Sequence, residues 1–409
     1  PPSPTRGEGI HECAQMKITK IEDMHADGGW RVFSFLKMTT DERLIGWSEY
    51  NETSWNPGLT GIIRALAQTL IGKDPRAFAK LSGELRAQTR MNAGGLADQA
   101  IGALENACID IAAKAANIPA YSLFGGPYRD KLKLYWSHCG TFRAANSEFF
   151  EKVLKTPPLR SLNDVKALGH EVVERGYKAL KTNPIFFEPS GPRLFNPGFR
   201  PGLDFARGGG ERMYEAIGDL IRAFREGTGP NVEIQLDVNF GFRPEALRQL
   251  LFALDPLVLS WLEADLHEPT QLARVRAVTK TPIASLESIY GAHNYRPYFE
   301  AGSADVAIID VVWNGFLESV RIANLADTYE INVAPHNFYG HLASAMSAHF
   351  CAAVPNFRIM EYEADDVPWK DELFTHPPKI EDGMYVLSSR AGWGTDVNEE
   401  AVKAHPPRR

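Results

Sequence analysis

The sequence has few cysteines, no excess of basic residues and no long apolar run, and each absence excludes a class of protein. Four cysteines in 409 residues form no C-x-x-C pair, which argues against a disulfide scaffold or cysteine-built zinc site and fits a reducing, cytoplasmic compartment. Acidic residues outnumber basic ones by 51 to 44, and the net charge of -7 argues against nucleic acid as a partner. No run of about 18 apolar residues occurs, so we expect no membrane span. Pro1–Gln15 is polar and rich in proline, without the apolar stretch of a signal peptide, and we expect a disordered leader.

The sequence after this leader predicts a small unit of strands followed by helices. Met16–Met38 and Leu44–Ser48 have the composition of strands, and the glycine-containing loop His25–Trp30 interrupts the first of them. Farther along, apolar residues follow helical spacing, most clearly in Leu96–Asn117. We therefore predict one α+β domain over residues 16–130.

Beyond residue 130, short apolar runs alternate with amphipathic stretches. Runs that are continuously apolar predict strands covered on both faces, which means a parallel sheet with helices outside it. There are eight such runs, the number that a closed β/α barrel needs, and we place this barrel at residues 131–373. The predicted strands are Leu132–Trp136, Ala179–Lys181, Val232–Asp237, Val258–Glu263, Pro282–Ser285, Val306–Asp310, Ile331–Pro335 and Arg358–Glu361.

A long segment rich in glycine, proline and arginine, Phe186–Glu211, follows the second predicted strand. Loops of this length without structure of their own are usually lids, subunit contacts or disordered inserts. The sequence leaves these alternatives open, together with simple tolerance of an insertion.

Ionisable side chains occur at the carboxyl ends of six successive predicted strands. They recur at intervals of 23–26 residues, close to the length of one strand-helix unit of a barrel. Any single acid after a strand is more often a helix cap or a loop residue, but six at a nearly constant period predict one site at the carboxyl face of the barrel, where active sites lie. The six are Asp237, Glu263, Glu287, Asp310, His336 and Glu361.

The first three of these acids predict a metal site. Two carboxylates about 4 Å apart repel by roughly 4 kcal/mol at an effective dielectric constant of about 20. A divalent cation among Asp237, Glu263 and Glu287 would turn that repulsion into attraction, and oxygen ligands favour Mg²⁺, or Mn²⁺, over Zn²⁺. The next two strands bring Asp310 to His336, and a carboxylate beside an imidazole fixes its tautomer and raises its basicity.

Further polar residues at the strand ends suit an anionic substrate. Lys181 would direct a positive charge at it, Asn183 and Asn239 would offer neutral hydrogen bonds, and Glu361 could donate a proton if its pKa is raised. Together these groups suit removal of a proton next to a carboxylate, because the resulting ene-diolate needs a metal ion and a cation to stabilise it. Two more candidates for the pocket wall are His138 and Trp369.

In order and spacing, these segments resemble the mandelate racemase/muconate lactonizing branch of the enolase superfamily, most closely its acid-sugar dehydratases. The resemblance covers nearly the whole chain. It implies an α+β capping domain, a modified β/α barrel, a C-terminal segment at residues 374–409 that returns to the cap, and a homo-oligomer of even order. Its motifs are AIGALENACIDIAAKAANIPAYSLFGG in the cap, LKTN, LDVN, WLEADLHEP, PIASLESIYG, AIID, APHNFYGHLA and RIMEYE in the barrel, and RAGWGTDVNEEAV in the tail.

The resemblance also implies roles for individual residues. Asp237, Glu263 and Glu287 would be the metal ligands, and His336, paired with Asp310, would be the general base. The remaining matches are Glu361 as the acid at the end of the eighth strand, Lys181 beside the substrate carboxylate, and His25 and Trp30 as specificity residues in the mobile loop HADGGW.

Two departures from the family pattern bear on these roles. Many racemases of this branch carry K-x-K on the second strand, with the second lysine as a base on the opposite face, whereas this chain has Lys181 followed by Thr182 and Asn183. Dehydration needs one base, so this difference favours a dehydratase. In WLEADLHEP the acids are spread out, which leaves Asp265 and Glu268 as rival ligands, although the spacing favours Glu263.

We therefore predict a lyase that dehydrates an aldonate or aldarate to a 2-keto-3-deoxy acid with Mg²⁺. His336 would take the α-proton, and the β-hydroxyl would leave with help from His336 or Glu361. The alternative is a racemase, epimerase or cycloisomerase that uses the same ene-diolate and has Lys181, or a residue of the insert, on the other face. A barrel that binds a sugar acid without catalysis is a third possibility.

Overall fold

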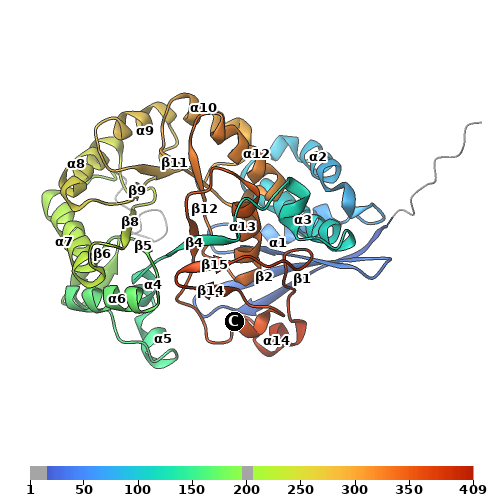
Figure 1. The fold of residues 1–409 in the computed structure, drawn as a ribbon, viewed down its shortest axis with the longest axis horizontal. Helices are drawn as coiled ribbons and strands as arrows, with labels where there is room; N and C mark the ends of the chain where they lie inside the picture. The colour runs from blue at the N-terminus through green and yellow to red at the C-terminus, as the bar shows by residue number, and fades with distance from the viewer. Residues whose placement is uncertain (1–15, 196–205, 409) are drawn as a thin grey trace, which may run out of the picture.

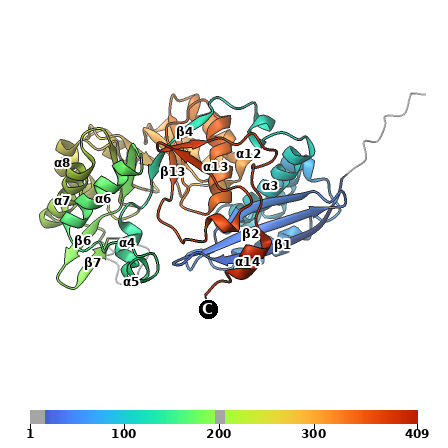
Figure 2. The same ribbon diagram turned by 60° about the horizontal axis from the view of Figure 1, so that its bottom comes forward.

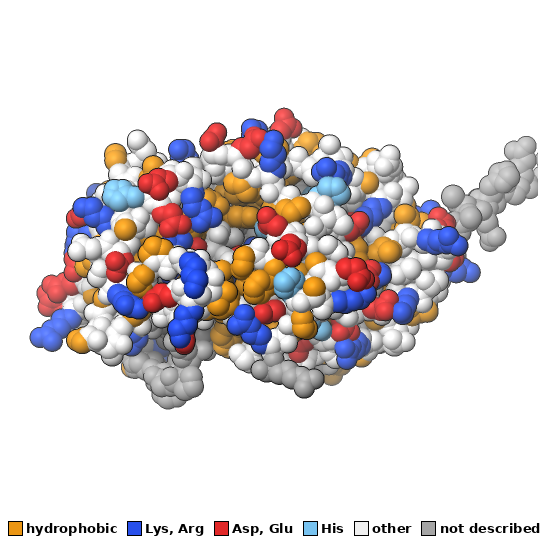
Figure 3. All heavy atoms as spheres, turned by 90° about the horizontal axis from the view of Figure 1, so that it is seen from below, with side chains coloured by type: hydrophobic (Ala, Val, Ile, Leu, Met, Phe, Trp, Pro, Cys, Tyr) orange, Lys and Arg blue, Asp and Glu red, His pale blue; other side chains and the backbone are white. Residues whose placement is uncertain are grey.

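The computed structural model describes residues 16–195 and 206–408, which form an antiparallel sheet with its helices beside a closed parallel barrel (Figure 1). The predicted leader Pro1–Gln15 lies outside the described residues. No helix within the described part of the chain is long and apolar enough to cross a membrane. On the face drawn in Figure 3, acidic and basic side chains are interspersed, and hydrophobic side chains gather around a hollow near the middle.

The cap is a three-stranded antiparallel sheet covered by helices. Strand β1 runs to Asp27, so the chain reverses at residues 28–31 and His25 lies in the strand, three residues before the turn, rather than in the predicted loop. The strongly predicted helix is present as α3, which is buried along most of its length between the cap sheet and the barrel. The elements of the cap are β1 (Ile18–Asp27), β2 (Val32–Thr40), β3 (Ile45–Tyr50), α1 (Leu59–Ala67), α2 (Phe78–Gln88) and α3 (Gly95–Ala115).

Polar side chains of α3 fix the cap to the barrel. Asn106 donates from Nδ2 to the carbonyl of Val311 at 3.1 Å and accepts from the backbone N–H of Phe316 at 2.8 Å. Glu105 accepts from the N–H of Leu317 at 2.9 Å. Buried polar groups are stable only when they are hydrogen-bonded, so these contacts specify how the two domains meet.

Eight parallel strands close the barrel, and each coincides with one of the predicted apolar runs. Neighbours pair in chain order from β4 to β12, β13 pairs with β4, and a bridge between Val333 and Phe357 completes the ring. Large and small residues together fill the inside, where Tyr135 contacts Trp261 edge-on and alanines belong to the same cluster. The strands are β4 (Lys131–Trp136), β5 (Ala179–Thr182), β8 (Glu233–Asp237), β9 (Trp261–Glu263), β10 (Ile283–Ser285), β11 (Val306–Ile309), β12 (Asn332–Pro335) and β13 (Met360–Tyr362).

Helices cover the outside of the barrel, as the amphipathic stretches predict. Helices α6 and α7 approach so closely that a Cβ on Gly227 would lie 2.1 Å from the carbonyl oxygen of Lys166, so this crossing requires glycine. The barrel helices are α4 (Thr141–Ala145), α5 (Ser147–Lys152), α6 (Leu162–Glu174), α7 (Glu211–Thr228), α8 (Pro244–Leu254), α9 (Pro269–Arg276), α10 (Ala292–Glu300), α11 (Val311–Asn314), α12 (Phe316–Asp327) and α13 (His341–Ala353).

The predicted long loop Phe186–Glu211 is in part a β-hairpin. Strands β6 (Ile185–Glu188) and β7 (Gly191–Leu194) pair antiparallel, with Ile185 opposite Leu194. Both of these residues are buried, so the hairpin has an apolar side that stabilises it against the barrel. Residues 196–205 lie outside the described residues.

The C-terminal segment returns to the cap, as the resemblance implies. Strand β15 (Met384–Val386) pairs with β14 (Lys379–Glu381) and with the start of β4. Helix α14 (Glu399–Ala404) lies beside β1 (Figure 2), where the N–H of Asp27 donates to the carbonyl of His405 at 2.8 Å. The last described residues therefore complete the cap.

Candidate active site

A cavity of about 500 Å³ lies at the carboxyl ends of the barrel strands and under the cap. The barrel contributes strand-end residues, and the cap contributes its β1–β2 turn, the segment after β3 and the start of α3. Among the predicted site residues, the wall includes Trp30, His138, Lys181, Asn183, Asp237, Asn239, Glu287 and His336.

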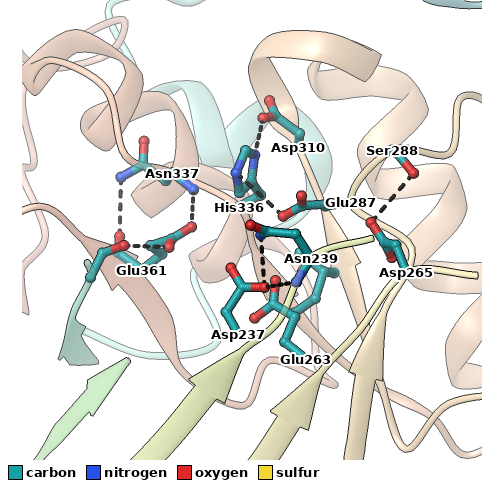
Figure 4. A network of polar contacts seen from close by, with 12 residues as sticks. Asp237, Asn239, Glu263, Asp265, Glu287, Ser288, Asp310, His336, Asn337 and Glu361 are labelled. Atoms are coloured by element: carbon teal, nitrogen blue, oxygen red, sulfur yellow. Dashed lines mark hydrogen bonds and ion pairs between the residues drawn. The ribbon is translucent and has the colours of Figure 1, made fainter. Parts of the chain in front are cut away.

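Three buried carboxylates lie side by side at one edge of this cavity (Figure 4). Asp237 ends β8 opposite Glu263, which ends β9, and Glu287 follows β10. Burial raises the pKa of each of the three carboxyls above its usual range, and the charges of the neighbouring acids raise it further, while Lys181 opposes the rise at Asp237 and Glu263. The site therefore lacks the positive charge that would be needed to keep all three carboxylates ionised.

This donor set fits a hard divalent cation. All three side chains offer oxygen, and the buried Oε1 of Glu263 has no hydrogen-bond partner among the described residues. Residues 16–195 and 206–408 contain no three His, Cys, Asp or Glu side chains already arranged as a metal cluster. Instead, Lys181 Nζ lies 3.0 Å from Glu263 and 3.8 Å from Asp237, and Asn239 donates to Asp237 at 2.8 Å. The acids would turn from these partners to share one ion.

The two rival acids of the fourth strand are engaged elsewhere. Asp265 accepts from Ser285 Oγ at 2.7 Å and from the N–H of Leu286 at 2.8 Å, so it anchors the segment after β10. Glu268 is exposed and caps α9 by accepting from the N–H of Thr270 at 3.2 Å. Glu263 is thus the acid of this strand that faces the other two carboxylates.

His336 and Asp310 form a buried pair beside the carboxylates. Nδ1–H of His336 donates to Asp310 Oδ2 at 2.6 Å, and Nε2 lies 3.4 Å from Glu287 Oε2. Asp310 also accepts from Tyr339 Oη and, at 2.8 Å, from the N–H of Trp313. Burial would lower the pKa of His336, but the charge of Glu287 and the hydrogen bond and charge of Asp310 outweigh burial and raise that pKa to about 10.

Lys181 and Glu361 form an ion pair beneath the cavity, with Lys181 Nζ 3.0 Å from Glu361 Oε1. Glu361 also accepts from Ser137 Oγ and from the N–H of Asn337, each at 2.6 Å. Burial would raise the pKa of Glu361, but the charge of Lys181 and these contacts lower it to about 2. The condition under which Glu361 would store a proton, a raised pKa, is therefore not met here, because a lysine is fixed against its carboxylate.

His138 lies two residues after β4 and lines the cavity on the side away from the carboxylates. Its Nδ1 lies 2.9 Å from Ser137 Oγ and 3.1 Å from Glu363 Oε2, and its ring stacks on Phe142 with centroids 4.4 Å apart. Burial lowers the pKa of His138 to about 3 and raises that of Glu363 well above its usual range.

Two predicted substrate contacts do not reach the cavity described here. His25 is hydrogen-bonded within the cap, to Ser34 at 3.0 Å and Asp23 at 3.1 Å, because β1 extends past it. Trp369 donates from Nε1 to the carbonyl of Asp27 at 2.7 Å and stacks on His405. Trp369 therefore anchors the cap to the loop after β13.

The structure adds wall residues that the sequence did not indicate. Gln99 of the cap donates from Nε2 to Tyr290 Oη of the barrel at 2.7 Å, and it accepts from Asn56 at 2.9 Å. Tyr290 stands within PIASLESIYG, three residues after Glu287, so its position was the one available signal. The other added wall residues are Asn51, Thr53, Trp55, Thr141, Phe142, Ala145, Asn146, Leu194, Ser288, Trp313 and Phe338.

Fold and site define a capped β/α-barrel enzyme with a buried carboxylate cluster and a histidine–aspartate pair at the strand ends. Residues 164–401 match the family described as Enolase C-terminal domain-like, and residues 28–125 match the Mandelate racemase / muconate lactonizing enzyme, N-terminal domain. The chain belongs to the enolase superfamily, in its mandelate racemase/muconate lactonizing branch.

Similar proteins cover nearly the whole chain. A D-xylonate dehydratase of Haloferax volcanii is 27% identical over 400 residues, which are 95% of this chain and 89% of the relative. RspA of Halomonas elongata, a D-galactonate dehydratase family member, is 26% identical over 416 residues, 96% of each chain. A solved structure from Burkholderia xenovorans strain LB400, provisionally named an L-alanine-DL-glutamate epimerase, is 41% identical with a TM-score of 0.93 and holds magnesium and fumarate. That match covers 96% of both chains.

Proposed function

We propose that this enzyme dehydrates an acid sugar, an aldonate or aldarate, to a 2-keto-3-deoxy acid with Mg²⁺ as cofactor. The observation that carries the proposal is the position of His336, which lines the same cavity as Asp237 and Glu287 and is held there by Asp310. Curated relatives named as D-xylonate and D-gluconate dehydratases are 27% and 25% identical over nearly the whole chain. A 41% identical structure holds magnesium.

In this proposal the carboxylates hold the cofactor and His336 moves the proton. Mg²⁺ bound by Asp237, Glu263 and Glu287 would bind the substrate carboxylate and stabilise the negative charge that builds on it. His336 Nε2 takes the α-proton in its neutral form, which is favoured once the Glu287 carboxylate is engaged as a ligand. Asp310 fixes the imidazole with Nε2 toward the cavity and stabilises the imidazolium that forms.

Neutral polar side chains around the cavity suit the hydroxyl groups of a sugar acid. Asn51 and Gln99 come from the cap, and Asn183, Asn239 and Tyr290 come from the barrel. Amides and phenols both donate and accept hydrogen bonds, so they can pair with a substrate hydroxyl that donates or with one that accepts. Their arrangement would set which sugar stereoisomer is turned over.

The test is a panel of aldonate and aldarate stereoisomers, incubated with and without Mg²⁺ and assayed for 2-keto acid with semicarbazide. We expect product from a small set of stereoisomers, and only when Mg²⁺ is present. No keto acid from any member of the panel would contradict the proposal. Activity that survives removal of divalent cations by a chelator would contradict the role of the carboxylates.

Epimerisation is the second candidate function, because the 41% identical structure is provisionally named an epimerase. It would use the same removal of the α-proton by His336 and then return a proton to the opposite face. Incubation in deuterated water separates the two functions. Deuterium at the α-carbon with inverted configuration and without loss of water would favour epimerisation over dehydration.

The even-numbered assembly implied by the resemblance stays a prediction. Light scattering of the purified protein would measure the number of 45.4 kDa chains in it.

A further inference from the structure

Loss of the β-hydroxyl as water requires a proton donor, and the ionised Glu361 is unsuited to that task. We propose that His138, with the buried carboxyl of Glu363 behind it, gives the departing β-hydroxyl its proton; this role rests on the proposed dehydratase function. Neither residue belongs to the carboxylate cluster or to the His336–Asp310 pair.

The first observation is how His138 is held. Its Nδ1 lies within hydrogen-bond distance of Ser137 Oγ and Glu363 Oε2, and the side chain of Glu363 is fully buried. The imidazole lies in the cavity wall, so Nε2 is the nitrogen left for the substrate. The backbone of His138 has a φ of +46°. This left-handed conformation costs energy for residues other than glycine and is often found at functional sites.

The second observation is the position of His138 in the ring of strands. Strand β13 pairs with β4, which His138 follows, and lies next to β12, which His336 follows. The carboxylates occupy β8 to β10 on the other side of the ring. Both imidazoles contact the ring of Phe338, with centroid distances of 5.1 Å for His336 and 5.6 Å for His138. The two imidazoles therefore lie near each other, and a substrate bound at the carboxylates would face both.

The third observation is the proton that the pair contains. Burial favours the neutral forms of both Glu363 and His138. The pair therefore holds one exchangeable proton more than a carboxylate beside a neutral imidazole would hold. With the Glu363 O–H donating to Nδ1, the hydrogen of the imidazole is on Nε2 and faces the cavity. Without that proton the pair would contain a buried carboxylate, whose desolvation the charges of Arg31 and Lys370 offset only in part.

Each proton that moves in this elimination has a donor and an acceptor. As the α-proton passes to His336, the electron pair of the C–H bond forms the C=C bond and the β C–O bond breaks. The departing hydroxyl takes the proton from Nε2 of His138 and leaves as water, while Nδ1 takes the proton of Glu363. His336 has then gained one proton and the His138–Glu363 pair has lost one, and exchange with solvent after tautomerisation of the enol restores both.

The test compares two leaving groups on one enzyme. In His138→Gln and Glu363→Gln, formation of keto acid from the aldonate should fall by about 10²–10⁴-fold, the usual contribution of a general acid. Fluoride leaves without a proton, so elimination from the 3-deoxy-3-fluoro analogue should continue at about the wild-type rate. Exchange of the α-proton with deuterated water should also continue. His170→Gln, on the exposed face of α6, is the matched control and should change neither elimination.

Undiminished keto-acid formation by His138→Gln would overturn the donor role. An equal fall in water and fluoride elimination would also overturn it, because a residue that only binds or positions the substrate affects both leaving groups. A wild-type enzyme that dehydrates no acid sugar would overturn both the proposed function and this role. Failure of the donor role alone is different, because the wild type would then still dehydrate its substrate.

Discussion

Two histidine–carboxylate pairs face the same cavity, yet their surroundings give them opposite charge states. The pKa of His336 is raised to about 10, because the charges of Glu287 and Asp310 outweigh the effect of burial. The pKa of His138 is lowered to about 3, because burial dominates and its partner Glu363 is itself kept neutral by burial. The same two residue types are therefore ionised in the first pair and neutral in the second, because their surroundings differ.

The largest expected effect comes from removing the first imidazole. His336→Asn should lower keto-acid formation by about 10³-fold or more, since it removes the base that starts the reaction. Exchange of the α-proton with deuterated water should stop as well, whereas it continues in His138→Gln. Proton NMR of the recovered substrate measures this exchange, and persistent exchange in His336→Asn would assign the base elsewhere. Metal binding should be unchanged in this variant.

The next effect concerns Glu287, whose charge raises the pKa of His336 in the first histidine–carboxylate pair. Glu287→Gln removes an oxygen ligand and its charge, so affinity for Mg²⁺ should fall at least about tenfold, as changes at metal sites usually do. Isothermal titration calorimetry measures it. Glu268→Gln is the matched control, because this exposed residue caps α9 and should leave the titration unchanged. An unchanged titration in Glu287→Gln would remove this residue from the ligand set.

A smaller effect should follow loss of one donor to the first pair. Tyr339→Phe removes the hydroxyl that donates to Asp310, and one hydrogen bond contributes about 1 kcal/mol, which corresponds to roughly a fivefold fall in kcat/KM. The ratio of α-proton exchange to keto acid should stay at the wild-type value, because the second pair is untouched. A changed ratio would show that Tyr339 also acts on the leaving group.

A last effect, on stability rather than on activity, tests whether burial alone can neutralise a histidine. His349 lies on α13 away from the cavity, accepts from the N–H of Tyr121 at 3.1 Å and has its pKa lowered to about 4 by burial. A folded-state pKa below the unfolded value of about 6.5 stabilises the protein above pH 6.5, and this contribution, on the order of 3 kcal/mol, is lost as the pH falls toward 4. Unfolding by urea at pH 7 and pH 5 should therefore show a weaker pH dependence in His349→Gln than in the wild type. Equal pH dependence in both would contradict the assignment, and His170→Gln controls for loss of a histidine.

Much of the barrel could be predicted because it depends on local pattern. A strand covered on both faces is usually continuously apolar, so β11 is visible in the sequence as Val306–Asp310. The period of a strand-helix unit then aligns one polar residue per strand at the carboxyl face. The cap helix α3 was likewise predictable from its spacing.

The parts that could not be predicted depend on contacts between distant segments. Glu363 lies 225 residues from His138 in the chain, and no local pattern pairs them. The charge of Glu361 depends on Lys181, which reaches it from β5, so its ionisation could not be read from the sequence of β13. The hairpin β6–β7 was missed because its two strands are only four residues long and lie within a segment rich in glycine and proline.

The central claim is that Asp237, Glu263 and Glu287 hold one hard cation opposite His336. The most direct test is a crystal structure of the protein with Mn²⁺, measured at a wavelength where manganese scatters anomalously. The account predicts one anomalous peak among these three carboxylates, about 2.0–2.3 Å from their oxygens. A peak bound by Asp265 or Glu268 instead, or no peak at saturating Mn²⁺, would contradict it.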